Sequence, residues 1–192
     1  AALIAVACFN DIAETKGMMI RTALHEHLSR FGYTRIETPI VENAALFLTK
    51  AGDQVIERLL TFSRSGKEYA LRPEFTASAV ERYQTLSGGA VRWQFSGEIF
   101  QDATSHPGRF QAMSLGAEFI GVSGTAADAE VIAAAALGLE HVGIQNYRVV
   151  IGHVGLTRHL LERFNLDDRT IRFLLNQKGA LALGHKTDVI EK

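Results

Sequence analysis

The segment that decides the fold is Leu71-Arg72-Pro73-Glu74-Phe75-Thr76, which is followed by Gly97-Glu98-Ile99-Phe100 and then by Gly116-Ala117-Glu118-Phe119-Ile120-Gly121. These segments place two carboxylates, Glu74 and Glu118, among apolar residues. Burying a carboxylate costs free energy unless a cation or a hydrogen-bond donor meets it. The pattern therefore predicts a site for a ligand that carries an amine.

The flanking sequence predicts helices packed on an antiparallel sheet, which is an α+β fold. Turn-forming residues 63–67 indicate a hairpin, and the polar loop 101–109 joins two longer strands. Pro39 restricts its strand to a sheet edge or to a place with an unusual neighbour, because proline donates no backbone hydrogen bond. We expect helices over 11–30, 75–86, 128–141 and 156–164, strands over 35–41, 59–62, 68–71, 91–100, 110–122 and 147–153, and a strand or ordered lead-in over 1–9.

Composition limits the class of protein. The chain has 192 residues, of which 47% are hydrophobic, and a formal net charge of −1. It can bury a substantial core, and a nucleic-acid partner is not expected from the overall charge. The single cysteine, Cys8, excludes an internal disulfide and favours a reducing compartment, so we expect a cytoplasmic protein. The apolar opening is too short to span a bilayer, and no membrane association is expected.

Common catalytic motifs are missing from the sequence. It contains no glycine-rich phosphate loop, no dinucleotide fingerprint, no paired-histidine metal spacing and no nucleophile elbow. His25 and His27 fall on a helix with an exposed pattern, His106 falls in the loop and His153 ends a predicted strand, so each is expected to be structural or solvated. We therefore expect no catalytic residue, no metal and no cofactor.

Taken in order, these motifs resemble the catalytic core of class II histidyl-tRNA synthetases and their paralogues. The resemblance runs from about Asp11 to Gly121. Pro39 matches the proline of the family's dimer-forming first motif, and the strand-loop-strand that ends at Gly121 matches its second motif. The resemblance implies a class II synthetase-like antiparallel sheet flanked by helices, and a homodimer that associates around residues 36–41. The third motif is absent, so the core predicted over residues 1–192 is expected to be incomplete at its C-terminal side.

The resemblance also implies an amino-acid pocket lined by Glu74, Thr76, Glu118 and Gln101. Glu74 and Thr76 can accept hydrogen bonds from an ammonium group, and Glu118 can accept one from an imidazole N–H, so histidine is the candidate ligand. For Glu74 the alternative is capping of the helix that follows it. For Arg72 the alternative to a ligand contact is pairing with Glu98 or Glu118 across the sheet.

Departures from the family pattern separate its members. Synthetases carry an arginine at the position of Gln101, where it binds the substrate carboxylate and the α-phosphate of ATP; a neutral amide cannot balance that charge. Ser114 replaces a glutamine of the second motif, and Asp102 adds negative charge. Adenylate formation is therefore expected to fail. Residues 150–161 and 173–179 resemble instead the regulatory subunit of ATP phosphoribosyltransferase, a synthetase paralogue of histidine biosynthesis.

Three functions follow from the resemblance. The first is a non-catalytic regulatory subunit that assembles with the short-form ATP phosphoribosyltransferase catalytic subunit, activates it and conveys feedback by histidine. The second is a histidyl-tRNA synthetase core that activates histidine with ATP. The third is an interaction module that keeps the dimeric shell without binding a ligand. The absent arginine favours the first.

Overall fold

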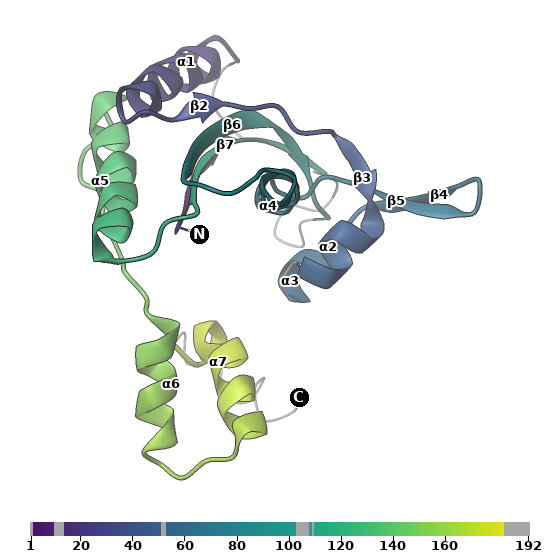
Figure 1. Ribbon diagram of the computed structural model, residues 1–192, viewed down its shortest axis with the longest axis vertical. Coiled ribbons are helices and arrows are strands. Elements are labelled where there is room, and N and C mark those ends of the chain that lie inside the picture. Colours follow the sequence, from purple (N-terminus) through teal and green to yellow (C-terminus); the bar gives the residue numbers. More distant parts are fainter. Residues whose placement is uncertain (1, 10–13, 51–52, 103–107, 109, 183–192) are drawn as a thin grey trace. The chain divides into compact units, whose positions relative to one another are not determined.

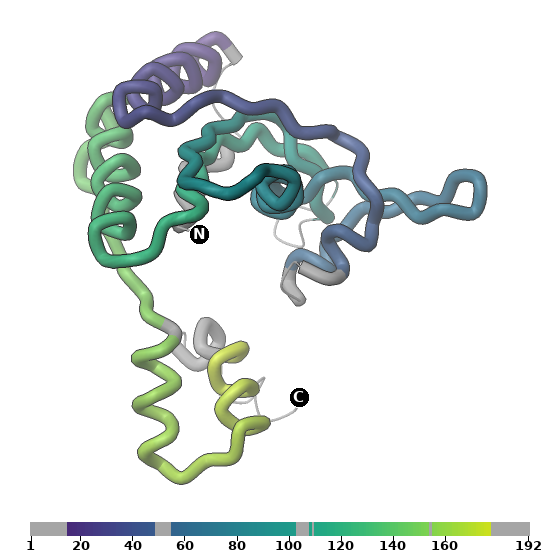
Figure 2. The backbone as a smooth tube through the Cα atoms, viewed as in Figure 1, coloured from purple at the N-terminus to yellow at the C-terminus, as the bar shows by residue number. Residues whose placement is uncertain are grey.

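The computed structural model describes residues 2–9, 14–50, 53–102, 108 and 110–182 of the chain (Figures 1 and 2). Contacts divide the chain into two compact units, Ala1–Tyr147 and Arg148–Lys192. The first unit holds the sheets and the helices that cover them, and the second is helical in its described part. The predicted α+β class is confirmed.

A four-stranded sheet forms the centre of the first unit, in the order β1-β7-β6-β2. Its middle is the ribbon of β6 (Val91–Phe100) and β7 (Gln111–Ile120), whose antiparallel register runs from Val91 opposite Ile120 to Phe100 opposite Gln111. β1 (Ala2–Phe9) pairs antiparallel with β7, and the short β2 (Thr34–Arg35) pairs parallel with β6. The strands expected at 1–9, 91–100 and 110–122 are confirmed.

Helices cover both faces of this ribbon (Figure 1). On one face, α1 (Glu14–Arg30) and α5 (Thr125–His141) bury an apolar cluster, and on the other α4 (Thr76–Gln84) packs on aromatic residues. Successive strand residues point to opposite faces, so every other residue of β6 and β7 belongs to each core. The first cluster contains Leu24, Leu28, Leu115, Ala117 and Phe119, and the second contains Phe75, Trp93, Phe95, Ile99 and Ile120.

A second sheet, in the order β3-β5-β4, carries the predicted hairpin. β4 (Thr61–Arg64) and β5 (Lys67–Leu71) are joined at Ser65 and Gly66, both of which have positive φ, as tight hairpin turns require. The hairpin is confirmed, although its turn is shorter than the 63–67 segment. β3 (Val41–Asn43) pairs with β5, and the short helices α2 (Ala44–Lys50) and α3 (Asp53–Ile56) follow it.

The single strand predicted over 35–41 is wrong. β2 ends at Arg35, β3 begins at Val41, and residues 36–40 connect the two sheets without belonging to either. Residues 35–41 do mix polar and apolar side chains, but Arg35 belongs to one sheet and Val41 belongs to the other. The backbone carbonyls of Thr38 and Pro39 accept hydrogen bonds from the side chain of Arg72 instead of from a neighbouring strand.

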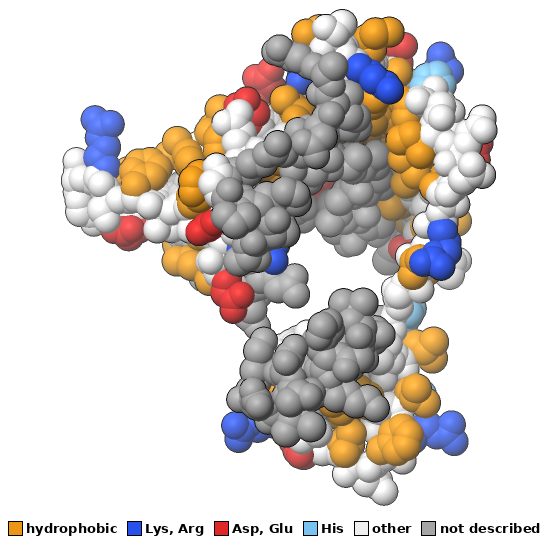
Figure 3. Space-filling model, turned by 180° about the vertical axis from the view of Figure 1, so that it is seen from behind, with side chains coloured by type: hydrophobic (Ala, Val, Ile, Leu, Met, Phe, Trp, Pro, Cys, Tyr) orange, Lys and Arg blue, Asp and Glu red, His pale blue; other side chains and the backbone are white. Residues whose placement is uncertain are grey.

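The second unit contains α6 (Val154–Glu162) and α7 (Asp168–Ala182). The predicted 156–164 helix is confirmed, shifted by two residues at each end. The strand predicted over 147–153 is wrong: these residues pair with no strand in the described part, and Val150 and Ile151 are 78% and 70% exposed. Apolar character alone therefore misled the prediction. Figure 3 shows hydrophobic side chains on the surface of this unit, where Leu156 and Phe164 are also exposed.

Helix-capping residues explain where α6 and α7 begin. The imidazole Nδ1 of His153 accepts a hydrogen bond from the backbone N–H of Leu156, at 2.9 Å, so His153 caps a helix and does not end a strand. Asp167 accepts hydrogen bonds from the hydroxyl and the backbone N–H of Thr170 and from the backbone N–H of Arg169. These contacts, the Thr170 hydroxyl first, lower the pKa of Asp167. No helix among the described residues is long and apolar enough to cross a membrane.

Candidate functional site

Glu118 is the most unusual polar residue of the described structure. It lies on β7 opposite Trp93, on the face that packs against α4, and its side chain is 0% exposed. Neither carboxylate oxygen has a hydrogen-bond partner among the residues that the structure describes. Burial raises the pKa of Glu118 to about 7, the hydroxyl of Thr76 partly offsets this increase, and the negative charge of Glu74 adds to it. The Thr76 hydroxyl is thus close to the carboxylate without forming a hydrogen bond of normal geometry.

Glu74 caps helix α4. Its carboxylate accepts hydrogen bonds from the backbone N–H groups of Thr76 and Ala77, the latter at 3.0 Å. Phe75, at the N-cap position, has no side chain that could do this. The capping alternative for Glu74 is therefore correct. The carboxylate is nevertheless only half-buried and still acts electrostatically on Glu118, so the structure does bring Glu74, Thr76 and Glu118 together.

Gln101 is hydrogen-bonded to the backbone at the residue that precedes Glu74. Its side-chain Nε2 donates a hydrogen bond to the carbonyl of Pro73 at 2.8 Å, and its own backbone N–H donates to Phe110. The amide therefore holds the residue that precedes Glu74. It brings no positive charge to this part of the molecule.

Arg72 is a buried cation. Its observed partners agree only in part with those predicted from the sequence. Its side chain is bonded to carbonyls: Nε donates to Glu98 at 2.8 Å, and Nη1 donates to Thr38 at 2.7 Å. The predicted partner Glu98 is thus contacted through its backbone oxygen, and neither carboxylate forms an ion pair with Arg72. Burial lowers the pKa of Arg72, and its guanidinium stacks on Phe75, 4.5 Å from the ring centre.

Gly97 makes room for this guanidinium. A Cβ atom at position 97 would lie 2.6 Å from Nη2 of Arg72, which is closer than real contacts allow. Because three carbonyls hold the guanidinium, it has little freedom to move away. The glycine of the Gly97-Glu98-Ile99-Phe100 segment is therefore explained by close packing.

Other predicted residues have a structural place or lie outside the described part. Trp93 is 8% exposed and lies in the core beneath α4. His106 lies outside the described residues. Among the residues that the structure describes, no cluster of three or more metal-binding side chains occurs.

A polar network on the opposite face of β6 was missed by the sequence analysis. The side chain of Gln94 is 1% exposed; it accepts a hydrogen bond from His25 Nδ1 at 2.7 Å and donates to the hydroxyl of Ser29 and the carbonyl of Tyr33. The second ring nitrogen of His25 bonds to Ser96. The exposed pattern expected for this helix is wrong at His27, which is 7% exposed and bonds to the carbonyl of Ala134.

The arrangement around Glu118 suits a small cationic group. Two carboxylates and a hydroxyl can accept hydrogen bonds from an amine, and a partner of this kind would relieve the cost of burying Glu118. The neighbouring guanidinium is already occupied by carbonyls and the neighbouring amide is neutral. Binding of a phosphate at this point would therefore find little compensation of charge.

Comparison with known proteins places the chain in a family. A family model for histidyl-tRNA synthetase matches residues 13–188. The histidine–tRNA ligase of Methanosphaerula palustris is 35% identical over 148 residues, which are 74% of this chain and 36% of the relative. That of Archaeoglobus fulgidus is 35% identical over 154 residues, 78% of this chain and 37% of the relative. The chain thus spans little more than a third of the length of these curated relatives.

Solved structures agree on the fold. A protein of Bacillus halodurans C described as an ATP phosphoribosyltransferase regulatory subunit/histidyl-tRNA synthetase has a TM-score of 0.80, with 23% identity over 96% of this chain and 50% of its own. Apo histidyl-tRNA synthetase of S. aureus has a TM-score of 0.56 and 26% identity, covering 71% of this chain and 34% of its own. The fold is a class II aminoacyl-tRNA synthetase-like core. Within that class, the chain belongs to the histidyl-tRNA synthetase family.

Proposed function

We propose that this chain is part of a non-catalytic regulatory subunit of ATP phosphoribosyltransferase. In this role it assembles with the short-form catalytic subunit, activates it and conveys feedback by histidine, which binds at Glu74, Thr76, Glu118 and Gln101. The observation that carries the proposal is a buried Glu118 without a hydrogen-bond partner among the described residues, together with a neutral Gln101 that is bonded to the residue before Glu74.

Glu118 supports the binding of an amino acid. A carboxylate that is 0% exposed and has no hydrogen-bond partner is costly, and the ammonium group or the imidazole N–H of histidine would supply the missing donor. Thr76 lies close enough to contribute its hydroxyl, and Glu74 adds negative charge even while it caps α4. A site of this kind favours a cation over a neutral ligand.

Gln101 supports a binding role without adenylation. Formation of an adenylate needs a cation at the α-phosphate of ATP, which an arginine fork supplies well. Gln101 cannot supply it, and its amide is held by the carbonyl of Pro73. Arg72 does not replace it, because its guanidinium is bonded to Thr38, Pro39 and Glu98. The likeness of the fold to the Bacillus halodurans C protein is in keeping with this proposal.

A homodimer is part of the proposal. The connecting segment 36–40 follows the edge strand β2, and Ile40 and Val41 are 46% and 45% exposed. An apolar segment at a sheet edge is suited to association with a second copy, and twofold dimers are the commonest oligomers.

The test is an activity assay with a purified short-form ATP phosphoribosyltransferase. We expect the rate to rise when this protein is added and to fall again with histidine, and we expect Glu118→Ala to remove the response to histidine while the activation remains. Glu57→Ala, which changes an exposed carboxylate outside the segment 36–40, is the matched control. A rate that does not respond to the added protein contradicts the proposal.

The second candidate is a histidine–tRNA ligase core, favoured by the names of the curated relatives. It predicts histidine-dependent exchange of pyrophosphate into ATP, whereas the regulatory proposal predicts none. If neither exchange nor activation is found, the third possibility, an interaction module without a ligand, is the one that remains.

A further inference from the structure

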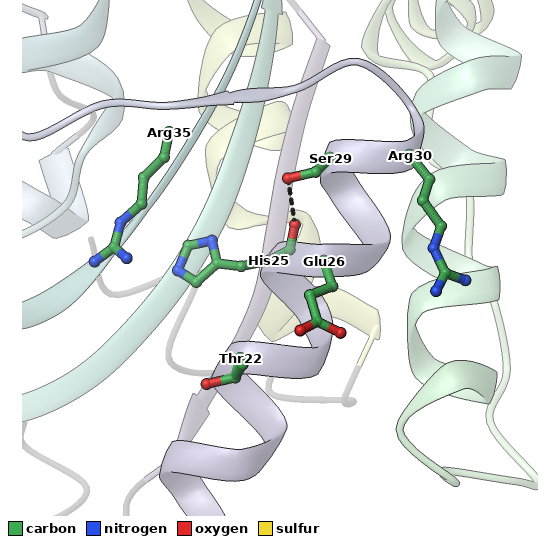
Figure 4. Close-up of a pocket in the computed structure, with 6 residues that line it drawn as sticks. All are labelled: Thr22, His25, Glu26, Ser29, Arg30 and Arg35. Carbon is green, nitrogen blue, oxygen red and sulfur yellow. Dashed lines mark hydrogen bonds between the residues drawn. The ribbon is translucent and has the colours of Figure 1, made fainter.

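An open hollow lies beside α1, on the face of the sheet that carries the polar network around Gln94. Glu118 lies on the opposite face. Its volume is about 420 Å3, and it is lined by Thr22, His25, Glu26, Ser29, Arg30 and Arg35. In Figure 4, His25 and Arg35 extend to one side of α1 and Arg30 extends to the other, with Glu26 between them. Five of the lining residues belong to α1, and Arg35 comes from the edge strand β2.

Positive charge in this hollow is not neutralised by the protein. Neither Arg30 nor Arg35 forms an ion pair or a side-chain hydrogen bond with any described residue. A third guanidinium, that of Arg21, is close enough to act electrostatically on His25, and its recorded contact is the thioether sulfur of Met113 at 3.5 Å. Glu26 is the single carboxylate among the lining residues.

The wall of the hollow is rigid because its polar groups are bonded to one another. Both ring nitrogens of His25 are engaged, with Gln94 at 2.7 Å and Ser96 at 2.8 Å, and Ser29 donates to the carbonyl of His25. The hydroxyl of Thr22 donates to Met18. The guanidinium groups of Arg30 and Arg35 are therefore the donors that remain free to meet a ligand.

We propose that this hollow binds a phosphate group, with Arg35 as the principal contact and Arg30 contributing charge. Guanidinium groups present paired N–H donors that match phosphate oxygens, and an open hollow of this volume admits either free phosphate or a small phosphate ester. The bound anion also offsets the repulsion among the guanidinium groups around His25. The site is distinct from the one around Glu118, but Arg35 directly precedes the segment 36–40 of the proposed dimer, so the oligomeric state is measured beside phosphate binding.

Titration of inorganic phosphate into the protein, followed by 31P NMR at constant ionic strength, tests the proposal. We expect Arg35→Gln to weaken binding about tenfold, as loss of one charge-assisted hydrogen-bonding group would. Glu26→Gln is expected to tighten binding, because it removes the nearest negative charge. Arg64→Gln, which changes an exposed arginine of β4, is the control and should leave the affinity unchanged. A parallel titration with AMP shows whether a phosphate ester is preferred to the free anion.

The imidazole of His25 provides a second readout. Burial, with the charges of Arg35 and Arg21, lowers the pKa of His25 in the free protein. Phosphate should raise that pKa relative to chloride, and this increase should disappear in Arg35→Gln.

Three results would overturn the proposal. The first is equal phosphate affinity in Arg35→Gln and the parent protein, and the second is an equal loss of phosphate affinity in Arg64→Gln, which would indicate attraction by general charge. The third is a dimer that Arg35→Gln dissociates without any effect of phosphate. The last result would identify the hollow as a contact between two copies.

Discussion

Two buried polar side chains on opposite faces of the same ribbon show how differently a protein can treat such groups. Gln94 on β6 and Glu118 on β7 are 1% and 0% exposed. Gln94 faces α1 and is bonded to His25, Ser29 and Tyr33, whereas Glu118 faces α4 and has no hydrogen-bond partner. A satisfied buried amide fixes the packing of a helix on the sheet, and an unsatisfied carboxylate lowers stability until a ligand meets it.

The largest expected effect on stability comes from replacing Gln94, the buried side chain whose hydrogen bonds are all made. Gln94→Leu should destabilise the protein by about 3 kcal/mol, because it leaves the ring of His25 and the carbonyl of Tyr33 without their buried partner. Urea unfolding measures this loss. Gln111→Leu, the same substitution at an exposed amide on the neighbouring strand, should cost less than about 1 kcal/mol. Equal losses in the two variants would show that the network is not a stabilising element.

Removing the charge of Glu118, the buried side chain without a hydrogen-bond partner in the described structure, should stabilise the protein. Glu118→Gln should stabilise the ligand-free protein by roughly 2 kcal/mol at pH 8 and change little at pH 4, because it removes a buried charge that exists only at the higher pH. The folded state holds the proton of Glu118 up to about pH 7, whereas the unfolded state loses it near pH 4.5. The free energy of unfolding of the parent protein therefore decreases as the pH rises from 4.5 to about 7, and the variant lacks this decrease.

Unfolding curves between pH 4 and pH 8 test this sign, with Glu37→Gln as the control for an exposed carboxylate. If Glu118→Gln destabilises the protein at pH 8, then Glu118 has a stabilising partner and the contrast with Gln94 is lost. Histidine added at pH 8 should stabilise the parent protein more than the variant, because the ligand's amine or imidazole meets only the ionised carboxylate.

The smallest effect concerns Gln101, an amide that is bonded like Gln94 but lies beside the carboxylates. Gln101→Ala should cost about 1 kcal/mol of stability through loss of its hydrogen bond to Pro73. Thermal or urea unfolding measures this cost, and Gln145→Ala, at an exposed position, is the control. A variant as stable as the parent would show that Gln101 does not support the backbone at Pro73.

Sequence reasoning found the elements whose pattern belongs to a single sheet or helix. The hairpin of β4 and β5 is marked by Ser65 and Gly66, and the ribbon of β6 and β7 by two long apolar strands. It failed where one stretch of chain serves two structures, as between Arg35 and Val41, and where apolar residues remain exposed, as at Val150. Periodicity does not distinguish these cases, because it records side-chain type and not the neighbour that each side chain meets.

The candidate site was predicted in the same uneven way. The proximity of Glu74, Thr76 and Glu118 was implied by the resemblance to the synthetase family, and in the structure Thr76 and Glu74 both act on the pKa of Glu118. The network around Gln94 was missed, because its members come from α1 and β6, far apart in sequence, and no local spacing links them. The role of Arg72 was also missed, since backbone carbonyls as partners leave no trace in the sequence.

The pairing of β1 with β7 has a consequence for how the protein folds. Ala2 pairs with Phe119, so the first strand of the chain can be hydrogen-bonded only after nearly the whole first unit has been synthesised. Contacts between such distant parts of a chain close slowly, because a long loop must be ordered before any of them forms. During synthesis, β1 must therefore wait for β7 before this pairing can form, and β7 is the point in the sequence at which the four-stranded sheet can first become complete.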